Sequence, residues 1–219
     1  MAEQRLYRKS EEVANAISHL GGALLSTAGL VLMIVFSALR GNAWHIVTTS
    51  IYGATLILLY FSSGMAHALK EGKAKELFFV FDKISIFLLI AGTYTPLSLV
   101  ILHGAFGWVI FGLEWGMAIA GIVLTFTRVA KSDSRVNYIF LALYVAMGWL
   151  MVIAIVPIFN SMPLAGGLLI LGGGLCYTIG IIFYAKLQFL YHHLVWHLFV
   201  VAGSLLHFLA IFHYVIPSK

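Results

Sequence analysis

Charged side chains are scarce in this chain. Only 10% of its 219 residues are Asp, Glu, Lys or Arg, whereas 62% are hydrophobic and the mean hydropathy is +1.01. A soluble domain carries about 25% charged residues, because its surface faces water. With 8 acidic and 13 basic side chains, this chain cannot cover a globule with charge. Lipid must therefore be the solvent for most of its surface.

Cysteine is nearly absent as well. Cys176 is the single cysteine, which excludes an intramolecular disulfide and leaves the compartment open. The apolar run from about Ile17 to Leu39 is too long for the core of a signal peptide, and no small-residue cleavage pattern follows it. We therefore expect this run to be the first helix, retained in the mature protein.

The net charge of +5 does not indicate a nucleic-acid partner. The basic residues stand in short loops between apolar runs, which is typical of membrane topology rather than of a phosphate-binding face. Internal repeats of the kind found in many transporters are also lacking. Because the polar stretches are short, we expect any chemistry to take place within the bundle or at its rim.

Seven apolar runs are each long enough to cross a bilayer as a helix, which takes about 20 residues. They cover residues 17–39, 45–68, 83–102, 106–127, 136–156, 164–185 and 192–215. None shows the alternation of a barrel strand. The sequence predicts an all-α integral membrane protein, a seven-transmembrane helix bundle that forms one domain over residues 1–219. Residues 1–16 are expected to be a cytoplasmic N-terminal segment.

The distribution of basic residues predicts the orientation. Eleven of them fall in the N-terminal segment and in the second, fourth and sixth loops, whereas the other side has only Arg40 and Lys219. Basic residues concentrate on the cytoplasmic side of membrane proteins. We therefore expect the N-terminus in the cytoplasm and the C-terminus outside.

Ionisable residues within membrane helices are costly and mark candidate functional sites. His67 lies near the cytoplasmic end of the second run, and Asp82 opens the third. His193 and His197 lie in the first turns of the seventh run and share one helix face, because they are four residues apart. Three helices are thus predicted to deliver these groups to one depth, near the inner leaflet.

Three imidazoles with one open position form the ligand set of a catalytic zinc ion. Nitrogen ligands favour zinc over magnesium or calcium. Asp82 is placed to accept a hydrogen bond from metal-bound water or to coordinate directly, and Ser63 lies one turn deeper than His67 on the same face. His192 is about 100° away around its helix and is expected to point elsewhere. The alternative stays open, because histidines spaced in this way are often unrelated and interfacial ones can face headgroups.

Further polar residues lie deeper in the predicted helices. Glu114 and His207 are expected to pair within the bundle. The segment 93–96, Thr-Tyr-Thr-Pro, predicts a kink in which hydroxyl groups satisfy the freed backbone carbonyls. The glycine run 172–174 predicts close helix packing.

Four segments together resemble the hemolysin III family. They are EEVANAISH (11–19), SSGMAH (62–67), FDKISIFLLIAGTYTP (81–96) and HHLVWHLFVVAGSLLHF (192–208). The family is the bacterial branch of the progestin and adipoQ receptor group, which includes the adiponectin receptors. That group belongs to a wider superfamily with the alkaline ceramidases, which hydrolyse a lipid amide. The resemblance covers essentially the whole chain.

The resemblance implies a zinc ion near the cytoplasmic face, with the family histidines falling on His67, His193 and His197. The family aspartate falls on Asp82 and its serine on Ser63, both placed to act through water near the metal. Lys83 departs from the pattern, since relatives often have histidine after the aspartate; this changes the local charge but removes no ligand.

The first of the four segments also carries polar residues that fit a site. Glu12, Asn15 and His19 lie at the cytoplasmic start of the first helix and are candidates for a supporting or gating role around the metal. The alternative is a polar helix cap with a hydrogen-bonded histidine.

Three functions are consistent with these features. The first is a zinc-dependent hydrolase of a lipid amide or ester, with Asp82 as general base and Ser63 steadying water or the developing oxyanion. The second is a non-enzymatic sensor or regulator of membrane state with a structural zinc ion. The third is a pore or transporter, which is disfavoured because an amphipathic pore-lining helix and paired midplane charges are lacking.

We expect a multi-pass protein of the bacterial inner (cytoplasmic) membrane that acts in lipid homeostasis and binds a membrane lipid or fatty-acid-like ligand. The oligomeric state is left open.

Overall fold

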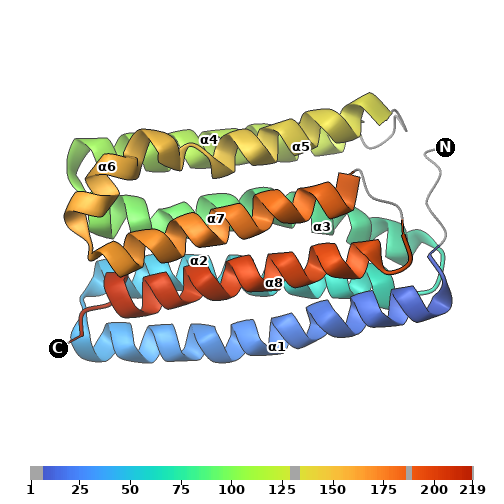
Figure 1. Ribbon diagram of the computed structural model, residues 1–219, viewed down its shortest axis with the longest axis horizontal. Helices are drawn as coiled ribbons and strands as arrows, with labels where there is room; N and C mark the ends of the chain where they lie inside the picture. Colours follow the sequence, from blue (N-terminus) through green and yellow to red (C-terminus); the bar gives the residue numbers. More distant parts are fainter. Residues whose placement is uncertain (1–6, 129–133, 186–188, 219) are drawn as a thin grey trace.

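The computed structural model describes residues 7–128, 134–185 and 189–218, and within them it contains helices and no strand. The helices run side by side as an elongated bundle (Figure 1). Seven spans in these ranges are long and apolar enough to cross a membrane. The predicted all-helical, seven-span architecture is confirmed.

Four of the seven spans are single α-helices, and three have two parts. The single ones are α1 (Lys9–Arg40), α2 (Ala43–Ala68), α4 (Gly104–Arg128) and α7 (Leu164–Ala185). The two-part spans are α3 (Lys73–Pro96) with the π-helix η1 (Leu97–Leu102), α5 (Ser134–Gly148) with α6 (Met151–Ser161), and α8 (His192–Ala210) with the π-helix η2 (Ile211–Val215). α1 and α8 begin at the same end of the bundle (Figure 1).

Two helices begin well before the apolar runs that define their spans. α1 begins at Lys9 rather than near residue 17, and α3 begins at Lys73 rather than near residue 83. The Glu11 carboxylate makes the early start of α1 favourable, because it accepts a hydrogen bond from the backbone N–H of Arg8 (3.0 Å). As a result, the polar residues near these starts stand on continuous helices and not on loops.

The orientation in the membrane stays a prediction. Four of the basic residues that support it lie outside the described residues, namely Arg5, Lys131, Lys186 and Lys219.

The outer surface of the bundle is apolar and part of its interior is polar. Leu24 and Leu39 are 76% and 75% exposed, whereas Thr48, Ser85 and Glu114 are completely buried. Soluble proteins rarely expose contiguous apolar surface on this scale. The distribution therefore fits a bundle whose periphery contacts lipid.

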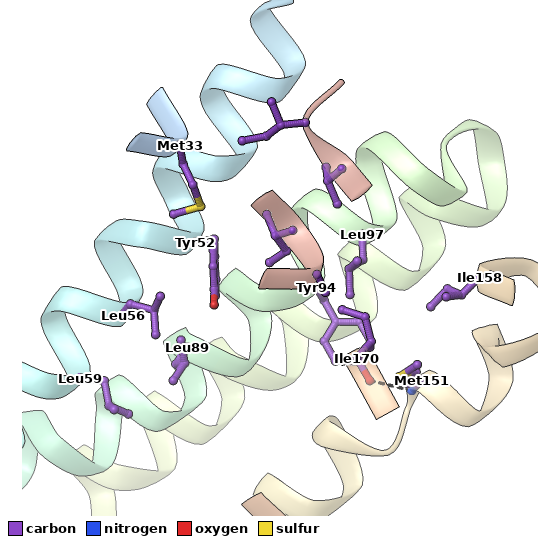
Figure 2. Packing of buried hydrophobic residues seen from close by; sticks show 14 of the residues in the cluster. Met33, Tyr52, Leu56, Leu59, Leu89, Tyr94, Leu97, Met151, Ile158 and Ile170 are labelled. Carbon is purple, nitrogen blue, oxygen red and sulfur yellow. Dashed lines mark hydrogen bonds between the residues drawn. The ribbon is translucent and has the colours of Figure 1, made fainter. Parts of the chain in front are cut away.

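Buried side chains from most of the spans pack into one cluster (Figure 2). Tyr52 and Leu56 of α2 lie against this core together with Leu89 of α3, and Ile170 of α7 belongs to the same cluster. α7 and α8 approach each other backbone to backbone, since a Cβ atom added at Gly173 would lie 3.0 Å from the carbonyl oxygen of Gly203. This close contact agrees with the role expected of the glycine run.

The fifth span is interrupted at its middle, where one continuous helix over residues 136–156 was expected. α5 ends at Gly148 and α6 begins at Met151. The hydroxyl group of Tyr94, on α3, donates to the carbonyl oxygen of Gly148 (2.9 Å) and accepts from the backbone N–H of Met151 (2.6 Å). Figure 2 shows Tyr94 pointing at Met151. A side chain inserted into the hydrogen-bond ladder of a helix is a known cause of such breaks.

The hydroxyl groups next to Pro96 bond to backbone groups, but none of the bonds between described residues goes to the carbonyl oxygen of Gly92, which the proline frees. Thr93 and Thr95 donate to the carbonyl oxygens of Leu89 and Ala91 within α3, both at 2.8 Å. The Tyr94 hydroxyl group instead bonds to backbone groups at the break in the fifth span. The sequence indicated that hydroxyl groups would satisfy freed backbone groups, but it did not indicate which helix the tyrosine would serve.

Candidate metal centre

Three imidazoles from two helices meet at the end of the bundle where α1 and α8 begin. His67 stands in the last turn of α2, and His193 and His197 stand in the first turns of α8. One ligand atom of each lies within 4.8 Å of the others, so this group could hold a metal ion. The ring centroids are 4.6 to 5.2 Å apart, and all three residues are buried.

Helix α1 supplies the hydrogen-bond partners of two of these rings. A carboxylate oxygen of Glu12 lies 2.5 Å from Nδ1 of His67, and the hydroxyl group of Ser18 lies 3.0 Å from Nδ1 of His197. Each contact leaves Nε2 of the ring for an ion. Partners of this kind fix the tautomer and the orientation of a metal-binding imidazole. Nδ1 of His193 is buried and has no hydrogen-bond partner among the described residues.

Lys75 fixes the Glu12 carboxylate from its other side. Its ammonium group lies 2.7 Å from the second carboxylate oxygen of Glu12 and 2.8 Å from Glu71, and the residue is only 5% exposed. From the sequence, Lys75 is one of the basic residues that predict the orientation, and no pattern points to Ser18. Two weak features of the sequence could have pointed to these residues. Glu71 and Lys75 are four residues apart, and Ser18 stands beside His19.

His19 and Asn15 lie against the same group of rings. The His19 ring stacks on His197, with centroids 3.5 Å apart and an angle of 11° between the planes, and it makes a T-shaped contact with the ring of Tyr60. Both His19 nitrogen atoms and both polar atoms of the Asn15 side chain are buried without a hydrogen-bond partner in the described part of the chain. The alternative of a hydrogen-bonded cap histidine is therefore wrong for His19.

A cavity of about 280 Å³ opens onto the three rings. Asp82 and Ser63 line it, and the Asp82 carboxylate lies beside the Ser63 hydroxyl group. Asp82 does not belong to the group of three ligand atoms that the described residues form. Most of the remaining lining is apolar or aromatic, contributed by α2, α3, α5, α7 and α8. The arrangement therefore joins a nitrogen ligand set, a carboxylate and a hydroxyl group to an apolar chamber.

The cavity extends from this end deep into the bundle. His207, ten residues beyond His197 on α8, also lines it. At 1.5 Å per residue this is a depth of about 15 Å along the helix. At the near end, the ring of Tyr7 lies over His193, with centroids 5.1 Å apart. The chamber is long and narrow, with the three histidines near one end.

Two other histidines lie apart from this group. Nδ1 of His192 lies 3.0 Å from the carbonyl oxygen of Phe183, so the ring points away from the three-histidine group, as its angular position predicts. Nε2 of His207 lies 3.0 Å from the carbonyl oxygen of Ile170. His207 is thus paired with α7, in agreement with the expectation of pairing within the bundle.

The same expectation is wrong for Glu114. Both of its carboxylate oxygens are buried and lack a hydrogen-bond partner in the residues that the structure describes. Tyr94 is close enough to interact with its charge, but the Tyr94 hydroxyl group already bonds to Gly148 and Met151. Glu114 therefore has no hydrogen-bond partner within the described part of the bundle.

Comparison with known proteins shows the family. A family model described as "Haemolysin-III related" matches residues 7–208, which include every residue of the three-histidine group and its α1 partners. The chain belongs to the hemolysin III family. The resemblance identified from the four sequence segments is thereby confirmed.

Relatives of this hemolysin III chain come from bacteria and from animals. It is 38% identical to Hemolysin-3 of Bacillus cereus over 210 residues, covering 95% of this chain and 93% of the relative. It is 39% identical to the Hemolysin-3 homolog of Bacillus subtilis (strain 168) over 209 residues, covering 95% and 96%. A human protein named monocyte to macrophage differentiation factor is 27% identical over 219 residues, covering 95% and 86%.

Proposed function

We propose that this hemolysin III protein is a zinc-dependent hydrolase that cleaves an amide or ester bond of a membrane lipid. The observation that carries the proposal is the three-imidazole group at the end of an apolar cavity that a carboxylate and a hydroxyl group also line.

The side chains that are present fit zinc. His67, His193 and His197 offer three nitrogen atoms, a set that suits zinc better than magnesium or calcium. Nδ1 of His193 is buried without a partner among the described residues. An unpaired polar atom in a buried site is costly, and rotation of this ring onto an ion would give it a role. Glu12 and Ser18 would hold the other two rings, with His19 and Asn15 as further supporting groups.

Zinc held by these rings would acidify a water molecule and polarise the lipid carbonyl group. Asp82 then acts as general base and takes a proton from the water. Ser63, whose hydroxyl group lies beside the Asp82 carboxylate, orients this water molecule. The acyl carbon–nitrogen or carbon–oxygen bond breaks, the hydroxyl group of water joins the acyl carbon, and the proton passes to the departing amine or alcohol.

The shape of the cavity supports a lipid with a single chain in the chamber. Its volume of about 280 Å³ lies near the small end of ligand pockets, which measure about 300–1,000 Å³. Its lining is mainly apolar, and the periphery of the bundle is apolar too. One acyl chain of a membrane lipid or fatty-acid-like ligand fits this chamber better than a complete headgroup.

We also place the protein in the bacterial inner (cytoplasmic) membrane with the centre beneath the inner headgroups. The support is the concentration of basic residues on the side of the N-terminus and the two Bacillus relatives.

The first experiment measures release of fatty acid from N-acylated and O-acylated lipids by purified, zinc-loaded protein, wild type beside Asp82→Asn. We expect turnover by the wild type and a loss of about 10²- to 10⁴-fold in the variant, because the general base is removed. The zinc content should not change. Glu76→Gln, an exposed carboxylate on the same helix, is the control and should keep full activity.

The same experiment separates hydrolysis from sensing. If the zinc ion only ties α2 to α8 in a non-enzymatic sensor, no acyl lipid is hydrolysed and Asp82→Asn behaves like the control. Absence of turnover by fully zinc-loaded wild type would contradict the hydrolase proposal.

A further inference from the structure

The cavity has a second polar region, away from the three-histidine group. Tyr177 of α7 and His207 of α8 both line it, with ring centroids 5.5 Å apart. Ser204, which contacts Tyr177, is seven residues beyond His197 and His207 is ten, so this region lies about 10–15 Å deeper along α8. The hydrocarbon core of a bilayer is about 30 Å thick, which places these side chains near its middle. The mechanism proposed above uses none of them.

Tyr177 belongs to a small group of hydroxyls. The Tyr60 hydroxyl group donates to the hydroxyl oxygen of Ser204 (2.7 Å) and also lies 3.3 Å from the carbonyl oxygen of Val200. The Ser204 and Tyr177 hydroxyl groups lie 2.8 Å apart, and either can be the donor in this contact. When Ser204 donates to Tyr177, the Tyr177 proton is left for a ligand. Tyr177 is the member of the pair that lines the cavity.

His207 has a hydrogen-bond acceptor that no described residue donates to. Its Nε2 lies 3.0 Å from the carbonyl oxygen of Ile170. A carbonyl oxygen can only accept, so Nε2 carries the proton and Nδ1 has a lone pair. Nδ1 is buried and has no partner among the described residues, and the whole residue is only 8% exposed. An unsatisfied buried acceptor is costly, so a bound partner for it would be stabilising.

We propose that Tyr177 and His207 form a subsite for a hydroxyl group on the lipid chain. The lipid oxygen accepts a hydrogen bond from Tyr177, and the lipid hydroxyl proton is donated to Nδ1 of His207. A hydroxyl group is both donor and acceptor, as this pair requires, whereas a ketone or ether oxygen only accepts and leaves His207 unsatisfied. This proposal rests on the proposed function in one respect, namely that a lipid chain occupies the cavity. The proposal predicts that the preferred ligand carries a hydroxyl group on its chain, about 10–15 Å from the reacting carbonyl group.

The test is a binding measurement that needs neither zinc nor turnover. Purified protein with its zinc chelated is loaded with a fluorescent fatty acid, which is then displaced by stearic acid or by hydroxystearic acids with the hydroxyl group at successive chain positions. We expect one mid-chain position to bind about tenfold more tightly than stearic acid. Tyr177→Phe should abolish this preference and leave the affinity for stearic acid unchanged.

Tyr144→Phe is the matched control. Tyr144 also lines the cavity, but its hydroxyl group donates to the carbonyl oxygen of Lys83 (2.8 Å) and has no proton left for a ligand. This variant should keep the preference for the hydroxylated chain.

Several results would overturn the proposal. Equal affinities across the positional series of the wild type would show that water alone satisfies Tyr177 and His207, and this result needs no variant to fold. A preference that survives in Tyr177→Phe would place the hydroxyl group elsewhere. If stearic acid itself fails to bind, the lipid cavity of the proposed function fails together with the subsite. If stearic acid binds and the series is flat, only the subsite fails.

Discussion

The three-histidine group and the break in the fifth span are both polar regions inside an apolar bundle, but their hydrogen bonds differ. At the break, the exposed ends of α5 and α6 are bonded to Tyr94, and the Trp149 side chain donates to the hydroxyl group of Thr178 (3.1 Å). Around the histidines, polar atoms of Asn15, His19 and His193 are buried with no partner among the described residues.

The difference suggests that the break has a structural role, whereas the three-histidine group binds a ligand. In a bilayer, an unpaired polar group costs several kcal/mol, because no water can replace a missing partner. At the break, a side chain of the protein satisfies the backbone groups of Gly148 and Met151, so these groups need no ligand. A region with several unpaired atoms beside a cavity gains stability when an ion, water or substrate binds. Breaking each region in turn should therefore affect different properties.

The largest expected effect is the loss of metal in His193→Ala. Removing one of three nitrogen ligands should lower the zinc affinity by at least about 100-fold, since even residues that only support a ligand are worth 10- to 100-fold. Elemental analysis of purified protein should give about one zinc ion per chain in the wild type and close to none in the variant. His213→Ala, an exposed histidine at the other end of the same span, should bind zinc normally. An unchanged zinc content in His193→Ala would remove the metal centre from this site.

A smaller effect is expected from Glu12→Gln. The amide can still contact His67, but it lacks the negative charge that the imidazole and Lys75 face. Zinc affinity, measured by competition with a chelator, should fall by about 10- to 100-fold. Glu71→Gln, which alters a contact with the same lysine but touches no histidine, is the control and should change the affinity little. Equal behaviour of the two variants would mean that Glu12 does not orient His67.

The smallest effect is expected from Tyr94→Phe, and it should appear in stability alone. The variant removes the hydroxyl group that bridges Gly148 and Met151, and the helix can partly restore its own hydrogen bonds there. The free energy of unfolding in detergent should fall by about 1 kcal/mol, with the zinc content unchanged. Tyr214→Phe is the control, because the Tyr214 hydroxyl group has no hydrogen bond within the described ranges. Loss of zinc in Tyr94→Phe would show that the two regions are coupled.

The sequence predicted the parts of the site that depend on helix periodicity and depth. His193 and His197 share a face because they are four residues apart. His67 and Asp82 were expected at one depth because apolar runs end and begin beside them, and both line the cavity, although α3 itself begins at Lys73. The sequence did not predict that Glu12 bonds to His67, that Ser18 bonds to His197, or that Lys75 holds Glu12. These contacts join α1 to α2, α3 and α8, and no local pattern fixes which residues meet across helices.

The break in the fifth span illustrates the same limit. Residues 136–156 are apolar throughout, and a hydropathy pattern cannot distinguish one continuous helix from two helices joined at Gly148 and Met151. The interruption depends on a tyrosine some fifty residues earlier in the chain. Only the packing of α3 against this span brings that hydroxyl group to the backbone.

Scarce charge and long apolar runs are enough to predict that this protein lies in lipid as seven helices, because a helix satisfies its own backbone there. The sequence also determined which residue types carry the candidate chemistry. Which polar atoms are paired, and which are left unpaired beside the cavity, depends on how the helices pack. The physical reason is that hydrogen bonds between helices act over about 3 Å, a precision set by packing and not by the spacing of residues along one helix.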